Sequence, residues 1–277
     1  DILLQGMDGN TTLFTMLQLD ASDAGAARFT NGTVSLPSIS NLADTNTGIF
    51  FPAADTIAFT TGGVDRFRIS EASITTNTAG TDNVRLGENA GEAILSGGDR
   101  NIVIGKNAGQ AITTADSNVA IGWEALKSEN THANNVAIGA SALTDQDSGQ
   151  DAYNVAVGYN AGFNATTSLF STFVGGLSGG LGVTTGNNNS AFGYLSGNDL
   201  TSGNANTLLG AFAGTNLTTG FDNVAVGTSA LDVDIDGNKS TAVGRNALGG
   251  QTGTDADMHN TAVGFEAGKG STTGKFN

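Results

Sequence analysis

The 277-residue chain has no cysteine and only two prolines. The lack of cysteine excludes disulfides and thiolate-bound metals as sources of stability. No apolar run approaches the roughly 20 residues of a membrane-spanning helix, so we expect no membrane insertion. Basic residues are also few, 11 Lys and Arg against 26 Asp and Glu, and the net charge of −15 argues against nucleic acid as a partner.

Glycine, in contrast, is abundant: 41 residues of 277, about twice its usual share of roughly 7%. Helical periodicity is sustained nowhere. This composition predicts an all-β protein rich in turns. Residues 1–77 and 78–277 differ in pattern, so we expect a small N-terminal domain and a larger repeat domain.

In residues 78–277 a short apolar run ends in glycine every 17 to 20 residues. These repeat glycines are Gly87, Gly105, Gly122, Gly139, Gly158, Gly175, Gly193, Gly210, Gly227, Gly244 and Gly264. A unit of this length cannot bury a core of its own and must stack on its neighbours. The pattern predicts a parallel β-solenoid, or β-roll, of about eleven coils.

Positions are counted here from each repeat glycine. Position −1 is always apolar, position −3 is Val, Ile, Thr or Ser, and both share one strand face because strands have a period of two. We expect that face to line the coil interior. Position −2, usually Ala, would then point outward and pack against other chains. The predicted packing residues are Ala120, Ala137, Ala156, Ala191, Ala225, Ala242 and Ala262.

Position −4 is Asn in nine of the eleven units, with Ser171 and Ser240 as the exceptions. Asn tolerates turn geometry, and stacked Asn side chains can hydrogen-bond from coil to coil. The pattern therefore predicts a structural ladder rather than a ligand site. Its members are Asn83, Asn101, Asn118, Asn135, Asn154, Asn189, Asn206, Asn223 and Asn260.

The motif Asn-Val-Ala-Ile-Gly-x-x-Ala, at 118–125 and 135–142, resembles the head-domain repeat of trimeric autotransporter adhesins, the YadA-like left-handed β-roll. The resemblance covers roughly residues 78–277, although the units here are several residues longer. It implies that three rolls pack around a threefold axis. The chain stops at the Asn of a twelfth unit, so we expect further protein or processing there.

Residues 1–77 lack the repeat and alternate turns with short β-like runs at 11–19, 27–36, 48–51, 56–61 and 64–69. Residues 44–69 resemble a shaft segment of tail fibres of tailed phages, especially marine ones. Together the two resemblances imply a homotrimeric viral tail fibre. Its partners would be other virion tail proteins and a host-surface glycan or receptor, and its location the virion.

Two alternatives stay open. A bacterial trimeric surface adhesin, or an extracellular filament subunit, would share the β-roll and place the chain at a cell surface. A polysaccharide-degrading tailspike would need two carboxylates about 5 to 9.5 Å apart, and the acidic residues are too scattered to single out a pair. We therefore expect no enzymatic activity.

Few residues suggest a ligand. Asp232, Asp234 and Asp236 resemble the opening of a calcium loop, but Val243 stands where an EF-hand needs its bidentate carboxylate, so only a partial cage for Ca²⁺ is predicted. No other cofactor is expected. Asp145, Asp147 and Asp151 form a looser acidic cluster.

Position +1 carries four aromatic residues that we expect at the surface, where they could stack on sugar rings: Trp123, Tyr159, Tyr194 and Phe265. The two histidines, His132 and His259, are expected to be solvated.

Overall fold

The computed structural model describes residues 2–7, 13–20, 26–29, 31–70, 73–76, 80–253 and 257–277. Every regular element in these ranges is a β-strand. The chain divides into two compact units, Asp1–Asn77 and Thr78–Asn277, the boundary that the change of sequence pattern predicts.

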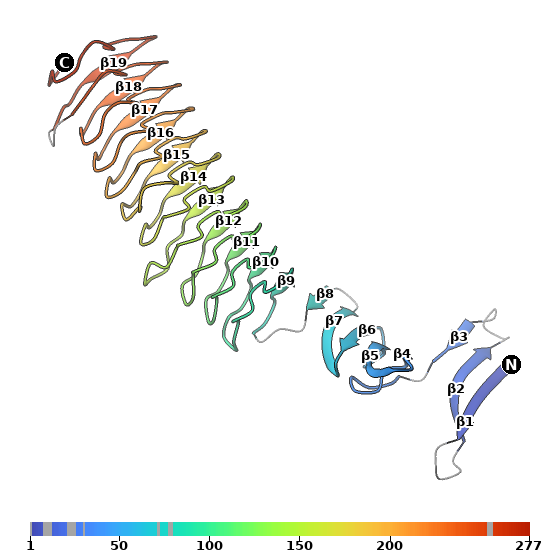
Figure 1. Ribbon diagram of the computed structural model, residues 1–277. Coiled ribbons are helices and arrows are strands. Elements are labelled where there is room, and N and C mark those ends of the chain that lie inside the picture. Colours follow the sequence, from blue (N-terminus) through green and yellow to red (C-terminus); the bar gives the residue numbers. More distant parts are fainter. Residues whose placement is uncertain are drawn as a thin grey trace. The chain divides into compact units, whose positions relative to one another are not determined.

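The N-terminal unit contains two antiparallel sheets (Figure 1). The first joins β1 (Ile2–Met7), β2 (Leu13–Asp20) and β3 (Ala26–Arg28). The second joins, in order, β4 (Ile39–Asn41), β5 (Asp44–Phe50), β6 (Ile57–Thr61), β7 (Val64–Ser70) and β8 (Ser73–Thr76). The sequence prediction missed β1, β4 and β8, and it was wrong to extend a β-run from 27 to 36, because β3 ends at Arg28.

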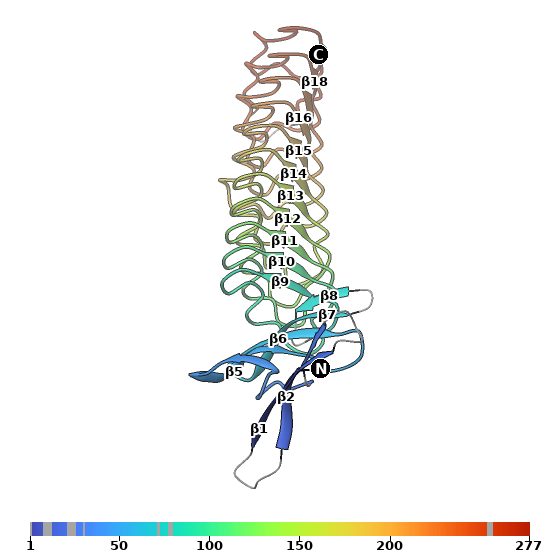
Figure 2. The same cartoon turned by 90° about the vertical axis from the view of Figure 1, so that its right-hand side faces the viewer.

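The second unit is a parallel β-solenoid whose eleven strands form one sheet in sequence order (Figures 1 and 2). The strands are β9 (Val84–Leu86), β10 (Ile102–Ile104), β11 (Val119–Ile121), β12 (Val136–Ile138), β13 (Val155–Val157), β14 (Thr172–Val174), β15 (Ser190–Phe192), β16 (Thr207–Leu209), β17 (Val224–Val226), β18 (Thr241–Val243) and β19 (Thr261–Val263). Pairing is in register throughout, so that Val119, Ala120 and Ile121 face Val136, Ala137 and Ile138.

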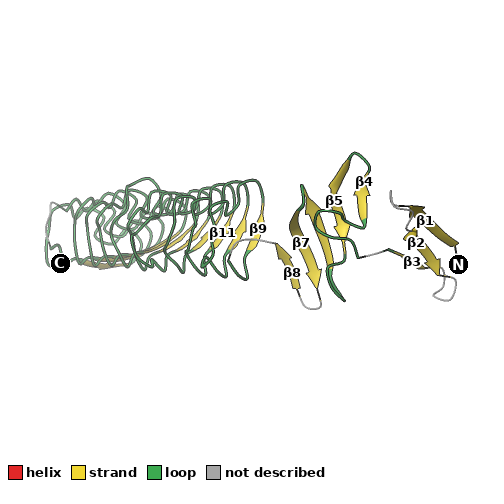
Figure 3. Ribbon diagram, turned by 90° about the horizontal axis from the view of Figure 1, so that it is seen from below, coloured by secondary structure: helices red, strands yellow, loops and turns green. Residues whose placement is uncertain are grey.

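Each coil carries one three-residue strand, and turns make up the rest of it (Figure 3). The turns still bond from coil to coil: the N–H of Asn107 donates to the Glu88 carbonyl at 2.9 Å, and that of Gly109 to the Ala125 carbonyl at 2.9 Å. Backbone polar groups away from the sheet are therefore satisfied by stacking, as burial requires.

The repeat glycine is fixed by two independent constraints, shown by Gly158. Its φ of +138° lies outside the region that L-residues favour. A Cβ built on it would also lie 2.6 Å from the carbonyl oxygen of Gly175 in the next coil. Stacking thus leaves no room for a side chain at this corner.

The sequence prediction that positions −3 and −1 line the coil interior and position −2 points outward was wrong, and the structure shows the reverse. The central strand residues point into the coil, and Ala120, Ala137, Ala156, Ala191, Ala225 and Ala242 are 0% exposed, with Ala262 at 8%. They belong to the solenoid's own core and cannot serve as an outer packing surface. The Val, Ile and Leu residues on either side of them face outward. The physical reason is volume, because the lumen also holds the buried residues of position +3, such as Ala125 and Ala142.

The lumen is filled in two alternative ways. Where position +4 is glycine, an aliphatic side chain from position +7 can fold back over it, and a Cβ on Gly109 would lie 2.7 Å from Ile112 Cδ1. Where position +4 is leucine, position +7 is polar yet fully buried. These pairs are Leu126 with Glu129, Leu143 with Gln146, Leu231 with Asp234, and Leu248 with Gln251. Leucine at +4 therefore replaces the aliphatic side chain of +7.

The Asn ladder predicted from position −4 is present. The side-chain oxygen of Asn101 accepts the backbone N–H of Asn118 at 3.0 Å, and that of Asn118 accepts the N–H of Asn135 at 2.9 Å. Its amide groups also reach the coil that follows, as where Asn206 Nδ2 donates to the Gly220 carbonyl at 2.8 Å. Ser171 keeps the acceptor role, taking the N–H of Asn189 on its Oγ at 3.2 Å. The equivalent bonds of the other members are formed by Asn83, Asn135, Asn154, Asn189, Asn223 and Asn260.

Candidate functional site

The outward side of the solenoid sheet is a continuous uncharged surface, which we call the outer strand face. It consists of the first and last residues of β9 to β19. None of these 22 residues is charged, although the chain has 26 acidic and 11 basic residues. Leu86 is 65% exposed, Leu209 49% and Val263 69%, and most of the others are half-buried. Monomeric proteins rarely expose apolar surface of this extent, so this face is the strongest candidate for an interface.

The four predicted glycan-contact residues lie at the surface, as their position in the repeat suggests. Trp123 is 51% exposed, Tyr159 61%, Tyr194 51% and Phe265 67%. Contact with sugar stays a prediction. Tyr159 and Tyr194 are two coils apart, and the coil between them has Gly176 at this position, where a Cβ would lie 3.6 Å from Tyr194 Cδ2.

A second aromatic column was missed. At position −5 the rings of Tyr153 and Phe170 stack with centroids 5.7 Å apart, and His259 stacks on Phe276 at 4.9 Å. His259 keeps 40% of its side chain exposed beside this ring, so the prediction that it is solvated is confirmed. The 17-residue spacing within each of these pairs was the available signal, because it places equivalent residues of neighbouring coils one above the other.

Among the described residues, the ligand atoms of Asp232, Asp234 and Asp236 do not all lie within 4.8 Å of one another, as those of a cation cage would. Asp234 is fully buried, and its oxygens accept hydrogen bonds from Gly253 N at 2.7 Å, Gly237 N at 3.1 Å and Gln251 Nε2 at 2.5 Å. Burial raises the pKa of Asp234 above its ordinary value, although these donors oppose the shift. Asp234 therefore anchors its own loop, while Asp232 and Asp236 are half-buried.

One group of potential metal ligands does converge among the described residues: Glu129, His132 and Asp147, whose ligand atoms all lie within 4.8 Å of one another. His132 Nδ1 is 3.0 Å from Glu129 Oε1 and 3.7 Å from Asp147 Oδ1. Only 18% of the His132 side chain is exposed, so the prediction of a solvated histidine was wrong. Burial raises the pKa of Glu129, opposed by its contacts with His132.

Sequence reasoning missed this group because its members come from two coils. The available signal was Glu129 itself, which occupies the inward position +7 that holds Ile or Leu in four other coils. An acidic residue in a column of core positions needs a partner. Asp147 was noted only as part of a looser cluster with Asp145 and Asp151.

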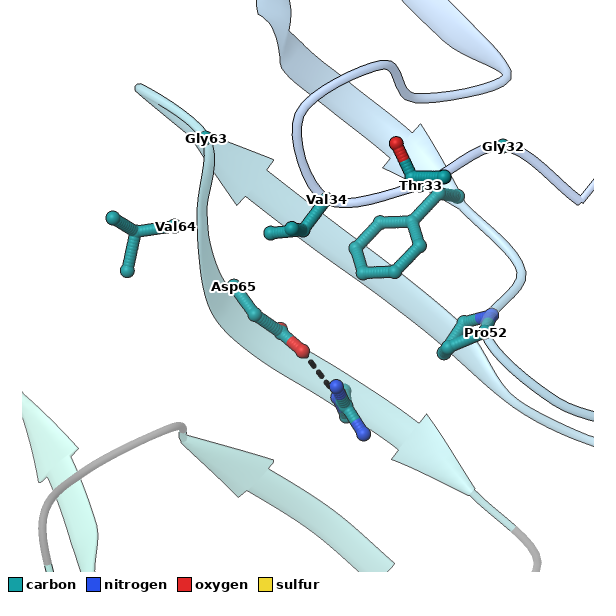
Figure 4. A pocket seen from close by; sticks show the side chains of 9 residues that line it. Gly32, Thr33, Val34, Pro52, Gly63, Val64 and Asp65 are labelled. Carbon is teal, nitrogen blue, oxygen red and sulfur yellow. Dashed lines mark hydrogen bonds and ion pairs between the residues drawn. The ribbon is translucent and has the colours of Figure 1, made fainter.

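The N-terminal unit has an open cavity of about 580 Å³ beside β7 (Figure 4). Thr33, Val34, Phe50 and Pro52 contribute to its lining. Its charged members, Asp65 and Arg68, are paired with each other. The cavity therefore offers mainly apolar contacts, and we assign no ligand to it.

In comparisons with known proteins, no family model, no curated protein and no solved structure matches the chain. Among the described residues there is no helix of the length and apolar character that a membrane span requires.

Proposed function

We propose that the chain is a structural and adhesive segment of a viral tail fibre, which assembles as a homotrimer and attaches the virion to a host-surface glycan. The observation that carries the proposal is the outer strand face. It runs along all eleven strands without a charged residue, and several of its apolar members, among them Leu86, Leu209 and Val263, are exposed in a single chain.

A second copy of the chain is the occupant that fits this face best. The face repeats at every coil with in-register strands, and a partner with the same repeat would match it along its length. Three copies can bring their outer strand faces together around one axis. The resemblance of the repeat to trimeric adhesin heads supports three copies, and that of residues 44–69 to phage fibres supports a virion protein that also joins other tail proteins.

The assembly step is tested by light scattering on the purified chain. We expect a trimer, and we expect Ile121→Lys combined with Val157→Lys to give monomers, because each places a charge on the outer strand face. The control is Thr228→Lys at an exposed position +1 outside that face, which should leave the trimer intact. A monomeric wild-type chain would overturn the proposal.

The attachment step is tested on an array of bacterial surface polysaccharides. We expect binding by the wild-type trimer and a loss of at least tenfold when Trp123, Tyr159, Tyr194 and Phe265 are all changed to Ala, because ring stacking on apolar sugar faces is removed. Light scattering on the same variant separates loss of contact from loss of assembly. Equal binding by wild type and variant excludes these residues as the contact.

A further inference from the structure

We propose that Glu129, His132 and Asp147 form a binding site for a divalent transition metal ion, with Zn²⁺ as the best-fitting ion. Glu129 and His132 follow β11 and Asp147 follows β12, so the ion would join two successive coils. The site is independent of the outer strand face and of the trimer.

The geometry of the three side chains suits a small tetrahedral ion. Zinc binds His nitrogen and carboxylate oxygen at about 2.0–2.2 Å, which places two ligand atoms of a tetrahedron roughly 3.3–3.5 Å apart. The distances from His132 Nδ1, 3.0 Å to Glu129 Oε1 and 3.7 Å to Asp147 Oδ1, lie on either side of this separation. Adjustments of a few tenths of an ångström would complete three ligands, leaving a fourth position for water.

The buried carboxylate of Glu129 has one oxygen that no protein group contacts by a hydrogen bond. The residue is fully buried, and its Oε1 accepts the N–H groups of Asn130 and His132, both at 3.1 Å. Its Oε2 is buried without a hydrogen-bond partner. Asp234 and Gln251 occupy the positions that correspond to Glu129 and Gln146 six coils further along. There Gln251 Nε2 donates to Asp234 at 2.5 Å, whereas Gln146 Nε2 has no hydrogen-bond partner. A cation bound at this carboxylate would compensate its buried charge, since an uncompensated buried carboxylate is costly.

The histidine is oriented for metal binding by a second residue. Thr131 Oγ1 lies 3.2 Å from His132 Nε2 and can accept the proton on that nitrogen. With an ion bound, Nδ1 would then present its lone pair to the metal, whereas without one Nδ1–H can donate to Glu129 Oε1 at 3.0 Å. Metal-bound histidines are commonly held by such a contact on the other ring nitrogen. A ligand set of one imidazole and two carboxylates favours Zn²⁺ over Ca²⁺ and Mg²⁺, which take oxygen ligands.

The test is a calorimetric titration of Zn²⁺ into the chelator-treated full chain. We expect one ion per chain, at least a tenfold weaker affinity in His132→Asn and in Asp147→Asn, and no change in His259→Asn. His259 is the matched control because it lies 3.6 Å from a single carboxylate, that of Asp257. Asp147 is 46% exposed, so its replacement leaves folding intact even if changes at buried Glu129 do not.

Two further measurements sharpen the outcome. Co²⁺ should bind in place of Zn²⁺ and give the visible absorption of a tetrahedral site in the wild type but not in Asp147→Asn. Zn²⁺ should raise the melting temperature of the wild type and of His259→Asn, but not that of His132→Asn or Asp147→Asn, because binding stabilises the folded state alone. Absence of stoichiometric binding, or an equal loss in His259→Asn, would overturn the site.

Discussion

At the scale of single residues, glycines of the solenoid allow two costs of adding a side chain to be distinguished: backbone strain and steric overlap with the next coil. Gly158 combines a φ of +138° with a carbonyl oxygen 2.6 Å from any added Cβ. Gly264 has a similar φ of +129°, but the nearest atom to its Cβ, on Ala267, is 3.8 Å away. Gly270 has neither constraint.

Alanine substitution at these three glycines should therefore give a graded series. We expect Gly264→Ala to cost about 1 kcal/mol through strain, and Gly158→Ala to cost more because two coils must also separate. Gly270→Ala should change stability by only a few tenths of a kcal/mol. Thermal unfolding followed by circular dichroism measures all three, and equal melting temperatures for Gly158→Ala and Gly270→Ala would refute the stacking argument.

The buried carboxylate of Asp234 should make stability depend on pH. Its raised pKa in the folded state means that folding favours the protonated form. Its contribution is therefore fully present below the pKa of the unfolded chain and is lost as pH rises through the higher folded pKa. We expect the wild type to gain stability relative to Asp234→Asn as pH falls from 7 toward 4.

Urea unfolding of both proteins at several pH values tests this. Asp232, whose pKa burial also raises, is present in both and cancels in the difference. A difference that stays constant with pH would contradict the assigned role of burial at Asp234.

At the scale of one coil, the pairing of positions +4 and +7 predicts non-additive mutations. Leu143→Gly should open a void and cost about 3 kcal/mol, and Gln146→Leu alone should overfill the lumen and cost about 1–3 kcal/mol. The double variant recreates the arrangement of Gly197 and Leu200. We therefore expect it to lose at least about 1 kcal/mol less than the sum of the single losses.

The matched control combines Leu143→Gly with Gln251→Leu, which lies six coils further along the solenoid. These two changes share no contact and should add. Denaturant unfolding of the five variants and the wild type completes both cycles. If both pairs are additive, the two positions do not compete for one space.

The coil also shows what the sequence could and could not predict. Period-two alternation identified two strand faces and the repeat fixed their register, but neither says which face is inside. Hydrophobicity alone predicts that Ile121 and Ile138 point into the coil. The limited volume of the lumen instead places the smaller Ala120 and Ala137 there. That volume depends on turn residues such as Leu126, whose position inside the coil no strand pattern reveals.

The same limit applies to the candidate metal site. The sequence marked Asp147 as acidic and His132 as isolated, because Glu129 and Asp147 are separated by 18 residues. Only the stacking of coils converts that separation into proximity. The Asn ladder was predictable because its members occupy one position of the motif, while the metal ligands occupy three different positions.

At the scale of the whole molecule, repulsion between the negatively charged chains opposes trimer assembly, and contact between their apolar surfaces favours it. Three chains of net charge −15 would carry −45 together, while the outer strand face has no charge of its own. Salt screens repulsion between exposed charges but leaves apolar contact in place. We therefore expect trimers to persist to lower protein concentration at 300 mM NaCl than at 20 mM NaCl.

Mass photometry over a dilution series at both salt concentrations measures this effect. The Thr228→Lys control should follow the wild type with a slightly smaller salt dependence, because it removes one unit of negative charge per chain. Weaker association at high salt would instead indicate an interface held by ion pairs.

The in-register stacking has a consequence for how such a chain changes through evolution. All ten strand junctions pair residue for residue, whether the intervening segment is short or long. Recombination between two repeats of one gene would remove or duplicate a whole coil and leave every remaining junction with an equivalent partner. The solenoid could then change length in steps of about 4.8 Å, the spacing of neighbouring strands, without a new fold having to be found.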